Sequence, residues 1–237
     1  MLFPLLAVIM DVSSSIRPPS ASSKWCPAWS DEFDSQKIDP AKWRVLGDSR
    51  RGGGMWLKRN VSLDGRGHLV IMSSPAKGKT TTGGIDTYGK FQQKYGLFVI
   101  RAELPTRPGH RVGFWLQSKN SAIHSDGRKG TEIDILEQYS RSNIVTHNLH
   151  WNGYGKYEKS WNYRFQMDSI QGWHTYALRW TPDNYQFYVD GALTAKTKAG
   201  GVSRVPEFIR ITDEPMEGMV AQKDKFLVDY VRVYSAC

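Results

Sequence analysis

The chain has 237 residues, of which 40% are hydrophobic and 23% charged, and its formal net charge is +9. This length and composition fit one large globular domain and exclude a disordered chain. The basic residues are scattered and no nucleic-acid-binding signature is present, so we expect no nucleic-acid partner, whereas the positive charge is compatible with an acidic polysaccharide. No segment has the ~18 uninterrupted apolar residues of a membrane-spanning helix.

The first 24 residues differ from the rest of the chain. Residues 1–10 are apolar, and residues 11–24 are rich in serine and contain Pro18-Pro19. This pattern predicts a signal peptide or a disordered leader over residues 1–24, although the basic residues that usually precede an apolar signal core are missing. We therefore expect a secreted protein, extracellular or periplasmic, with a single domain over residues 25–237.

Two cysteines lie at opposite ends of this domain, at Cys26 and Cys237. In a secreted protein an even number of cysteines favours a disulfide bond. A bond between these two requires the first and last strands of the domain to be neighbours.

From residue 25 onward the chain alternates short apolar strands with turns. The clearest predicted strands are residues 61–63, 68–72, 95–104, 111–117, 132–137, 144–151, 174–180, 185–190 and 226–234. Sustained helical periodicity is lacking between them. Many strands without interleaved helices predict an all-β protein, a β-sandwich or jelly roll.

The segment Glu132-Ile133-Asp134-Ile135-Leu136-Glu137 places three carboxylates in a strand that otherwise reads as buried. Side chains of a regular strand alternate between its two faces, so Glu132 and Asp134 share a face that Glu137 does not. A β-bulge after Asp134 adds one residue and brings Glu137 to the same face. Two carboxylates facing a cleft at ~5–5.5 Å suit a retaining glycosidase, in which one is the nucleophile and the other the acid/base.

This acidic strand resembles the active-site strand of glycoside hydrolase family 16, in the bulged form found in laminarinases, agarases and carrageenases. Other stretches agree with the family in order and spacing. They are Trp29-Ser30-Asp31-Glu32-Phe33-Asp34, Trp43, Lys94-Tyr95-Gly96 with Arg101, Gly113-Phe114-Trp115-Leu116, Trp173-His174-Thr175-Tyr176, Trp180, Asp190-Gly191, and residues 228–234. The resemblance covers residues 25–235. It implies a jelly roll like that of concanavalin A, with two antiparallel sheets and a concave substrate cleft.

The resemblance also implies the roles of the three carboxylates. Glu132 is expected to be the nucleophile, Glu137 the general acid/base, and Asp134 the assisting carboxylate between them. Among the residues expected to bind the sugar chain, Trp115 matches a stacking tryptophan and His150 a histidine of the neighbouring strand. Trp151 is a further candidate from this strand, with Trp56 and Trp161 as weaker ones.

The family often carries a structural calcium ion away from the cleft. On this resemblance the side chain of Asp229 and the carbonyl group of Gly67 are expected ligands, and Glu32 is a further one. Calcium prefers several oxygen ligands, which such a set could supply. No cofactor is expected for catalysis.

The chain departs from laminarinases at two places that bear on its substrate. Val112-Gly113-Phe114-Trp115 lacks their proline-alanine pair, and residues 209–215 replace a glycine pair and introduce Glu214 as a polar group of the cleft. The expected function is endo-hydrolysis of a β-1,3- or β-1,3/1,4-glucan by a monomer. The alternatives are endo-hydrolysis of a neutral or sulfated marine galactan (agar, porphyran or carrageenan type) and a lectin-like module that binds sugar without cleaving it.

Overall fold

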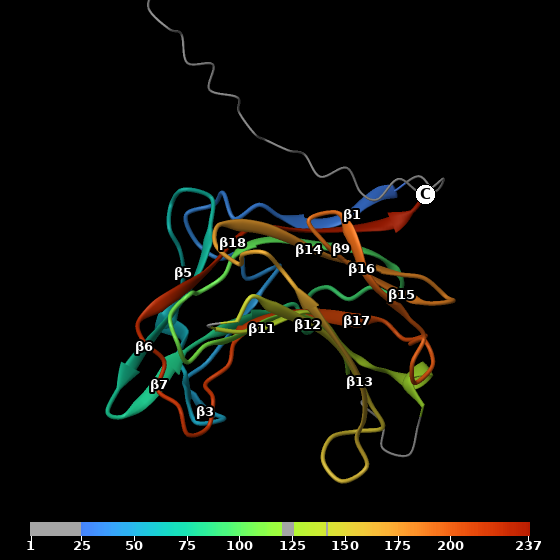
Figure 1. Ribbon diagram of the computed structural model, residues 1–237. Helices are drawn as coiled ribbons and strands as arrows, with labels where there is room; N and C mark the ends of the chain where they lie inside the picture. The colour runs from blue at the N-terminus through green and yellow to red at the C-terminus, as the bar shows by residue number, and fades with distance from the viewer. Residues whose placement is uncertain (1–24, 120–125, 141) are drawn as a thin grey trace, which may run out of the picture.

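The computed structural model describes residues 25–119, 126–140 and 142–237 as two stacked sheets (Figure 1), which are antiparallel except where residues 54–56 pair in parallel with residues 79–82. The predicted leader, residues 1–24, lies outside the described residues. Helix in the described part is limited to two short 3-10 turns, η1 (Lys58–Asn60) and η2 (Gly127–Lys129). The predicted all-β jelly roll is confirmed.

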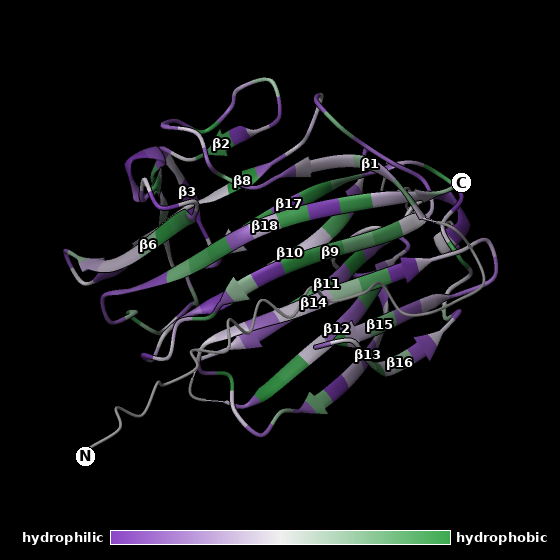
Figure 2. Cartoon of the chain, turned by 90° about the horizontal axis from the view of Figure 1, so that it is seen from above, coloured by the Kyte–Doolittle hydropathy of each residue, from purple (hydrophilic) through white to green (hydrophobic). Residues whose placement is uncertain are grey.

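The first sheet, which we call the outer sheet, has eleven strands in the order β16-β15-β14-β9-β18-β6-β7-β4-β3, with β1 paired to β18 and β5 to β6. Their bounds are β1 Trp25–Asp31, β3 Ser49–Arg51, β4 Gly54–Trp56, β5 Val61–Leu63, β6 Leu69–Ala76, β7 Lys79–Thr82, β9 Gly96–Glu103, β14 Trp173–Trp180, β15 Tyr185–Val189, β16 Ala192–Thr197 and β18 Asp224–Ala236. Seen from above, β18, β9 and β14 of this sheet lie side by side over the second sheet (Figure 2).

The second sheet, which we call the cleft sheet, has seven strands in the order β13-β12-β11-β10-β17-β8-β2. Their bounds are β2 Arg44–Leu46, β8 Gly84–Asp86, β10 Arg111–Ser118, β11 Glu132–Tyr139, β12 Ile144–Trp151, β13 Lys159–Gln166 and β17 Glu207–Asp213. The predicted strand 144–151 is confirmed to the residue, and the other predicted strands agree with the observed ones within a few residues.

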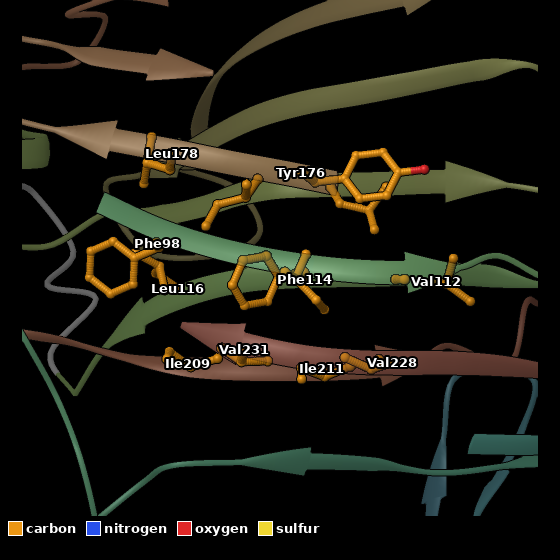
Figure 3. Close-up of a cluster of buried hydrophobic side chains, with 14 of the residues drawn as sticks. Phe98, Val112, Phe114, Leu116, Tyr176, Leu178, Ile209, Ile211, Val228 and Val231 are labelled. Carbon is orange, nitrogen blue, oxygen red and sulfur yellow. The ribbon is translucent and has the colours of Figure 1, made fainter. Parts of the chain in front are cut away.

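Apolar side chains from both sheets fill the space between the layers. Phe98 of β9 and Leu178 of β14 face Phe114 of β10 and Ile209 of β17, and all four are fully buried (Figure 3). Burial of each such side chain contributes roughly 1.5–3 kcal/mol to folding. The inner face of the cleft sheet is therefore fixed by this core, and its outer face is left for polar residues.

The first and last strands of the domain are neighbours, because β1 pairs antiparallel with β18. Cys26 and Cys237 form a disulfide bond, with their Cα atoms 5.3 Å apart. The predicted pairing is confirmed. Among the residues that the structure describes, no helix has the length and apolar character needed to cross a bilayer.

Candidate active site

The acidic strand β11 contains the predicted bulge. Its pairing with β12 shifts between Asp134 and Glu137, and Ile135 has no partner on β10. Because of the extra residue, Ile135 and Leu136 both point into the core, where they are fully buried. Glu132, Asp134 and Glu137 consequently line one cleft together.

The bulge is held from the neighbouring strand by His147. Its Nδ1–H donates to the carbonyl oxygen of Ile135 at 2.7 Å, and its Nε2 lies 2.8 Å from Oγ1 of Thr194 on β16 of the outer sheet. Burial lowers the pKa of His147 to about 4. A neutral histidine therefore satisfies the carbonyl group that the bulge leaves without a ladder partner.

The cleft has a volume of about 610 Å³ on the outer face of the cleft sheet. Of the seven side chains predicted to act on or bind the substrate, six line it. They are Glu132, Asp134, Glu137, Trp115, His150 and Glu214. The strand register that the sequence suggested thus brings these residues together.

Glu132 is in a setting that favours its protonated form. Burial, followed by the negative charge of Asp134, raises the pKa of Glu132 to about 7. The hydroxyl group of Tyr154 opposes this shift by donating to the Oε2 atom of Glu132, which also accepts a hydrogen bond from the amide of Gln117 at 3.4 Å. These hydrogen bonds stabilise the ionised carboxylate.

Glu137 lies on the other side of Asp134. Burial and the charge of Asp134 raise its pKa as well. Its Oε2 atom accepts a hydrogen bond from the side-chain amide of Asn148 at 2.9 Å, and its Oε1 atom lies 3.9 Å from Nε of Arg111. The raised pKa of Glu137 is the property that a general acid needs near neutral pH.

His150 connects Asp134 to a loop above the cleft. Its Nε2 atom lies 3.4 Å from Oδ2 of Asp134, and its Nδ1 atom lies 2.6 Å from Oε1 of Glu158. The hydrogen bond to Asp134 is the main reason that the pKa of His150 rises to about 9. The imidazolium that results at neutral pH is paired with the carboxylate of Asp134, the same group whose charge raises the pKa of both glutamates.

Glu132, Asp134 and His150 are the one group of acidic and histidine side chains in the described part of the chain that is close enough to surround a metal ion. A protonated histidine has no lone pair to offer a metal ion. Since the pKa of His150 is about 9, a metal ion bound here at neutral pH would have to displace a proton from this imidazole.

Trp115 lies on the floor of the cleft, but it is well covered. Only 7% of its surface is exposed, and its Nε1–H donates to Oγ1 of Thr212 at 3.1 Å. The guanidinium group of Arg210 lies 4.3 Å from its ring centroid. Glu214 accepts two hydrogen bonds from Arg51, at 2.7 and 3.1 Å. The two positions at which the sequence departs from laminarinases therefore carry arginine contacts.

Trp151 is not part of the cleft, contrary to the prediction. It follows His150 directly in β12, so its side chain points to the opposite face, where it packs against the core. Gly200 lies against its ring, since a Cβ atom on this glycine would come within 2.5 Å of the indole. The two weaker candidates divide: Trp161 lines the cleft, and Trp56 packs beside it under Arg51.

The side chains of two predicted calcium ligands are paired with arginines. Asp229 is paired with Arg101 at 2.5 Å, and Glu32 accepts two hydrogen bonds from Arg232 at 2.8 and 3.0 Å. A Cβ atom on Gly67 would lie 3.0 Å from a carboxylate oxygen of another residue, Asp34. Both predicted carboxylates are thus paired with arginines, the calcium site stays a prediction, and no step of the chemistry below involves this ion.

The start of β11 is anchored by a buried glutamate that sequence reasoning missed. Glu207, which is fully buried, accepts a hydrogen bond from the backbone N–H of Thr131, the residue before Glu132, at 3.2 Å. Burial raises the pKa of Glu207 to about 8, so that it is neutral at pH 7. No pattern in the sequence distinguishes this residue from a surface glutamate.

The chain matches one family model and several curated proteins. The model of glycosyl hydrolases family 16 matches residues 53–221. A beta-glucanase of Bacillus licheniformis is 30% identical over 204 residues, which cover 82% of this chain and 78% of the relative. A keratan-sulfate endo-1,4-beta-galactosidase of Sphingobacterium multivorum is 26% identical, over 87% of this chain and 54% of the relative.

The curated relatives that match first are longer proteins, since the chain spans 33% of an endo-1,3-1,4-beta-glycanase of Rhizobium meliloti and 54% of the galactosidase. Among solved structures, a laminarinase from Flavobacterium sp. has a TM-score of 0.73 at 26% identity, over 89% of this chain and all of that one. The family match covers the cleft carboxylates and most of both sheets. The chain belongs to glycosyl hydrolases family 16.

Proposed function

We propose that the protein is an endo-acting retaining hydrolase of a β-linked polysaccharide. Glu132 is the nucleophile, Glu137 the acid/base, and Asp134 the carboxylate that sets the charge of both. The observation that carries this proposal is the bulge at Ile135, which places all three carboxylates in one cleft. The openness of the cleft across the sheet agrees with attack on internal bonds of a long chain.

The reaction proceeds by double displacement. The carboxylate of Glu132 attacks the anomeric carbon while protonated Glu137 donates its proton to the glycosidic oxygen, and the bond between that carbon and oxygen breaks. Glu137, now ionised, takes a proton from water, and the water oxygen displaces Glu132 from the anomeric carbon. Both steps invert the anomeric centre, so the configuration is retained overall.

Burial and Asp134 raise the pKa of both glutamates, and hydrogen bonding to Glu132 supports this division of roles. The nucleophile must be ionised, and Glu132 receives hydrogen bonds from Tyr154 and Gln117 that favour its ionised form. The acid must be protonated, and burial together with Asp134 favours this form in Glu137. His150 lies 3.4 Å from Oδ2 of Asp134 and places a positive charge beside this carboxylate.

The first candidate substrate is a β-1,3- or β-1,3/1,4-glucan. Beta-glucanases and endo-1,3-1,4-beta-glycanases are prominent among the relatives in sequence, and a laminarinase is among the structures similar above 25% identity. The second candidate is a neutral or sulfated galactan. It is favoured by the contacts of Arg51 with Glu214 and of Arg210 with Trp115, at the two places where the sequence departs from laminarinases. A galactosidase acting on keratan sulfate is also a relative.

The roles of the two glutamates can be assigned by chemical rescue. With an activated aryl β-glycoside of the substrate sugar, Glu132→Ala should be reactivated by azide to give an α-glycosyl azide, because azide replaces the nucleophile. Glu137→Ala should give the β-glycosyl azide, because azide then attacks the glycosyl-enzyme. Equal products from both variants would contradict the assignment.

The substrate and the reaction class can be tested together. The purified protein is incubated with laminarin, lichenan, agarose, porphyran and carrageenan, and the products are sized. Short oligosaccharides of several lengths from one polymer would confirm endo-hydrolysis. Tight binding to one polymer without any product would instead favour the lectin-like function.

We propose in addition that the protein acts outside the cytoplasm, as a monomeric single domain over residues 25–237. The disulfide bond between Cys26 and Cys237 supports an oxidising compartment. Export with loss of residues 1–24 is tested by N-terminal sequencing of the secreted protein, and the monomer by size-exclusion chromatography with light scattering.

A further inference from the structure

A row of directly paired residues crosses five of the seven strands of the cleft sheet. Asp134 of β11 faces Trp115 of β10, which faces Arg210 of β17. The row continues from Arg210 to Asp86 of β8 and from Asp86 to Arg44 of β2. Directly paired residues of antiparallel strands point to the same face. A sugar chain that lies across the strands over Asp134 and Trp115 is therefore directed toward Arg210 and Arg44.

A second hollow lies at this far end of the row. It has a volume of about 590 Å³ and shares three lining residues, Gln117, Tyr154 and Arg210, with the main cleft. The two spaces are therefore continuous. From β11 to β8 there are three strand spacings of ~4.8 Å, or roughly 14 Å, so the second hollow receives sugar units away from the cleaved bond.

The second hollow is rich in positive charge. Three cationic side chains line it, Arg44, Lys119 and Arg210, against a single carboxylate, Asp86. Arg44 holds both oxygens of Asp86, at 2.9 and 2.6 Å, whereas Nε of Arg210 lies 3.8 Å from the nearer one. The one negative charge is thus largely used by Arg44, and positive charge remains in excess.

Arg210 shows this excess most directly. Its Nε is buried and has no hydrogen-bond partner in the described structure, although its Nη1 donates to Gln117 at 3.1 Å. A buried donor without a partner is costly unless a ligand supplies one. Burial and the neighbouring Arg51 lower the pKa of Arg210, although Asp86 opposes the shift.

The other two cations, Arg44 and Lys119, lie over the aromatic ring of Tyr88. Tyr88 packs edge-on against Phe208, with ring centroids 5.1 Å apart, and its backbone N–H donates to Asp86 at 3.2 Å. Arg44 and Lys119 lie 4.8 and 5.3 Å from the centroid of the Tyr88 ring. The cations are therefore gathered around one fixed ring.

We propose that this second hollow is a binding site for an anionic substituent, a sulfate ester or a carboxylate, on a sugar unit several positions from the cleaved bond. Lys119 and Arg44 bind the anion. Arg210 adds positive charge between this site and Trp115. The inference rests on the proposed function for the path of the sugar chain, and it adds that the cleft selects acidic over neutral forms of its polysaccharide.

The test uses laminarin and agarose oligosaccharides of matched length, each in neutral, O-sulfated and 6-carboxylated form. We expect the wild type to have a kcat/KM at least tenfold higher on an anionic form than on the neutral form of the backbone that it cleaves. This preference should fall as NaCl is raised, because salt screens exposed charges. Comparison of kcat/KM on the sulfated and the carboxylated oligosaccharides shows which of the two anions the site prefers.

Lys119→Gln should lower this preference severalfold. The matched control is Lys196→Gln on β16 of the outer sheet, which should retain the wild-type preference. A wild-type enzyme without preference for either anionic form, or a Lys119→Gln variant with an unchanged preference, would overturn the inference and leave the proposed function intact.

Direct binding separates the inference from hydrolysis. The same oligosaccharides and inorganic sulfate are titrated calorimetrically into Glu132→Gln. Tighter binding of an anionic oligosaccharide than of its neutral form and of inorganic sulfate, lost in Glu132→Gln/Lys119→Gln, supports the site even if no polymer is cleaved. Equal binding of neutral and anionic forms, no binding of any, or equal affinity for inorganic sulfate would overturn it.

Discussion

His147 of β12 donates a hydrogen bond to the carbonyl oxygen of Ile135, the residue that forms the bulge of the acidic strand. The contact is buried, and it joins the one irregular position of β11 to Thr194 of the outer sheet. The side chain that fixes the spacing between Asp134 and Glu137 therefore lies on the face opposite the cleft. Geometry in the active site is set from within the core.

Replacing this histidine should disturb catalysis without contact to the substrate. In His147→Leu the carbonyl group of Ile135 loses its buried partner, which costs about 1–3 kcal/mol of stability. We expect kcat to fall at least tenfold because Glu137 is misplaced, with a smaller change in KM. His147→Gln, whose amide can still donate, should recover part of the rate. Steady-state kinetics and thermal unfolding of both variants check this, and a wild-type kcat in His147→Leu would contradict it.

The hydroxyl group of Tyr154 should set the acidic limb of the pH profile. Activity requires ionised Glu132, whose pKa is about 7, so kcat/KM should rise with pH through this value. Without the hydrogen bond from Tyr154 the ionised form is less stable, and the limb in Tyr154→Phe should move to higher pH by up to ~1 unit. Tyr157→Phe, in the same loop, is the control and should keep the wild-type profile. Coincident profiles for wild type and Tyr154→Phe would show that the hydroxyl group has no such role.

Glu207 should make the protein less stable as pH rises. Its pKa is about 8 in the folded state and near 4.5 when unfolded, so between these values the unfolded chain releases a proton that the folded chain keeps. Stability is then lost by at most about 1.4 kcal/mol per pH unit over this range. Glu207→Gln removes the loss while it keeps an oxygen for Thr131. Its midpoint of thermal unfolding, relative to wild type, should be higher at pH 8 than at pH 4.5. The exposed Glu217→Gln should follow the wild type at both values.

Reduction of the disulfide bond should lower stability but not activity. The bond closes a loop of 211 residues and lies far from the cleft, so its loss mainly increases the entropy of the unfolded chain, by up to about 5 kcal/mol. The midpoint of thermal unfolding should fall on addition of dithiothreitol and in Cys26→Ser/Cys237→Ser, whereas kcat at 25 °C should stay within twofold of wild type. A double variant whose unfolding still responds to dithiothreitol would contradict this account.

The sequence was sufficient to predict the bulge because the misfit was local. Within six residues, three apolar side chains have to be buried and three carboxylates have to stay out of the core. One extra residue in the strand is the smallest change that meets both requirements. The same alternation of faces argued against Trp151 once His150 was placed in the cleft. That prediction failed because aromatic character was given more weight than strand position.

Other parts of the site depend on contacts that no local pattern encodes. Tyr154 reaches Glu132 from a loop 22 residues away, and Glu207 lies 76 residues from Thr131. The row from Asp134 to Arg44 depends on the register of five strands, of which only β10 and β11 are consecutive in the chain. The composition shows that basic residues outnumber acidic ones. Only the folded structure shows that Arg44, Lys119 and Arg210 gather at one end of the cleft.

The pairing of β1 with β18 gives the fold a nearly closed backbone. Since the Cα atoms of Cys26 and Cys237 are 5.3 Å apart, a short peptide linker could replace the disulfide bond and join the two ends covalently. New termini could then be opened at the exposed turn Asp190-Gly191, on the edge of the outer sheet away from the cleft. The same fold should therefore form when the strands are synthesised in a different order. A circular permutant with these termini should assemble the same cleft.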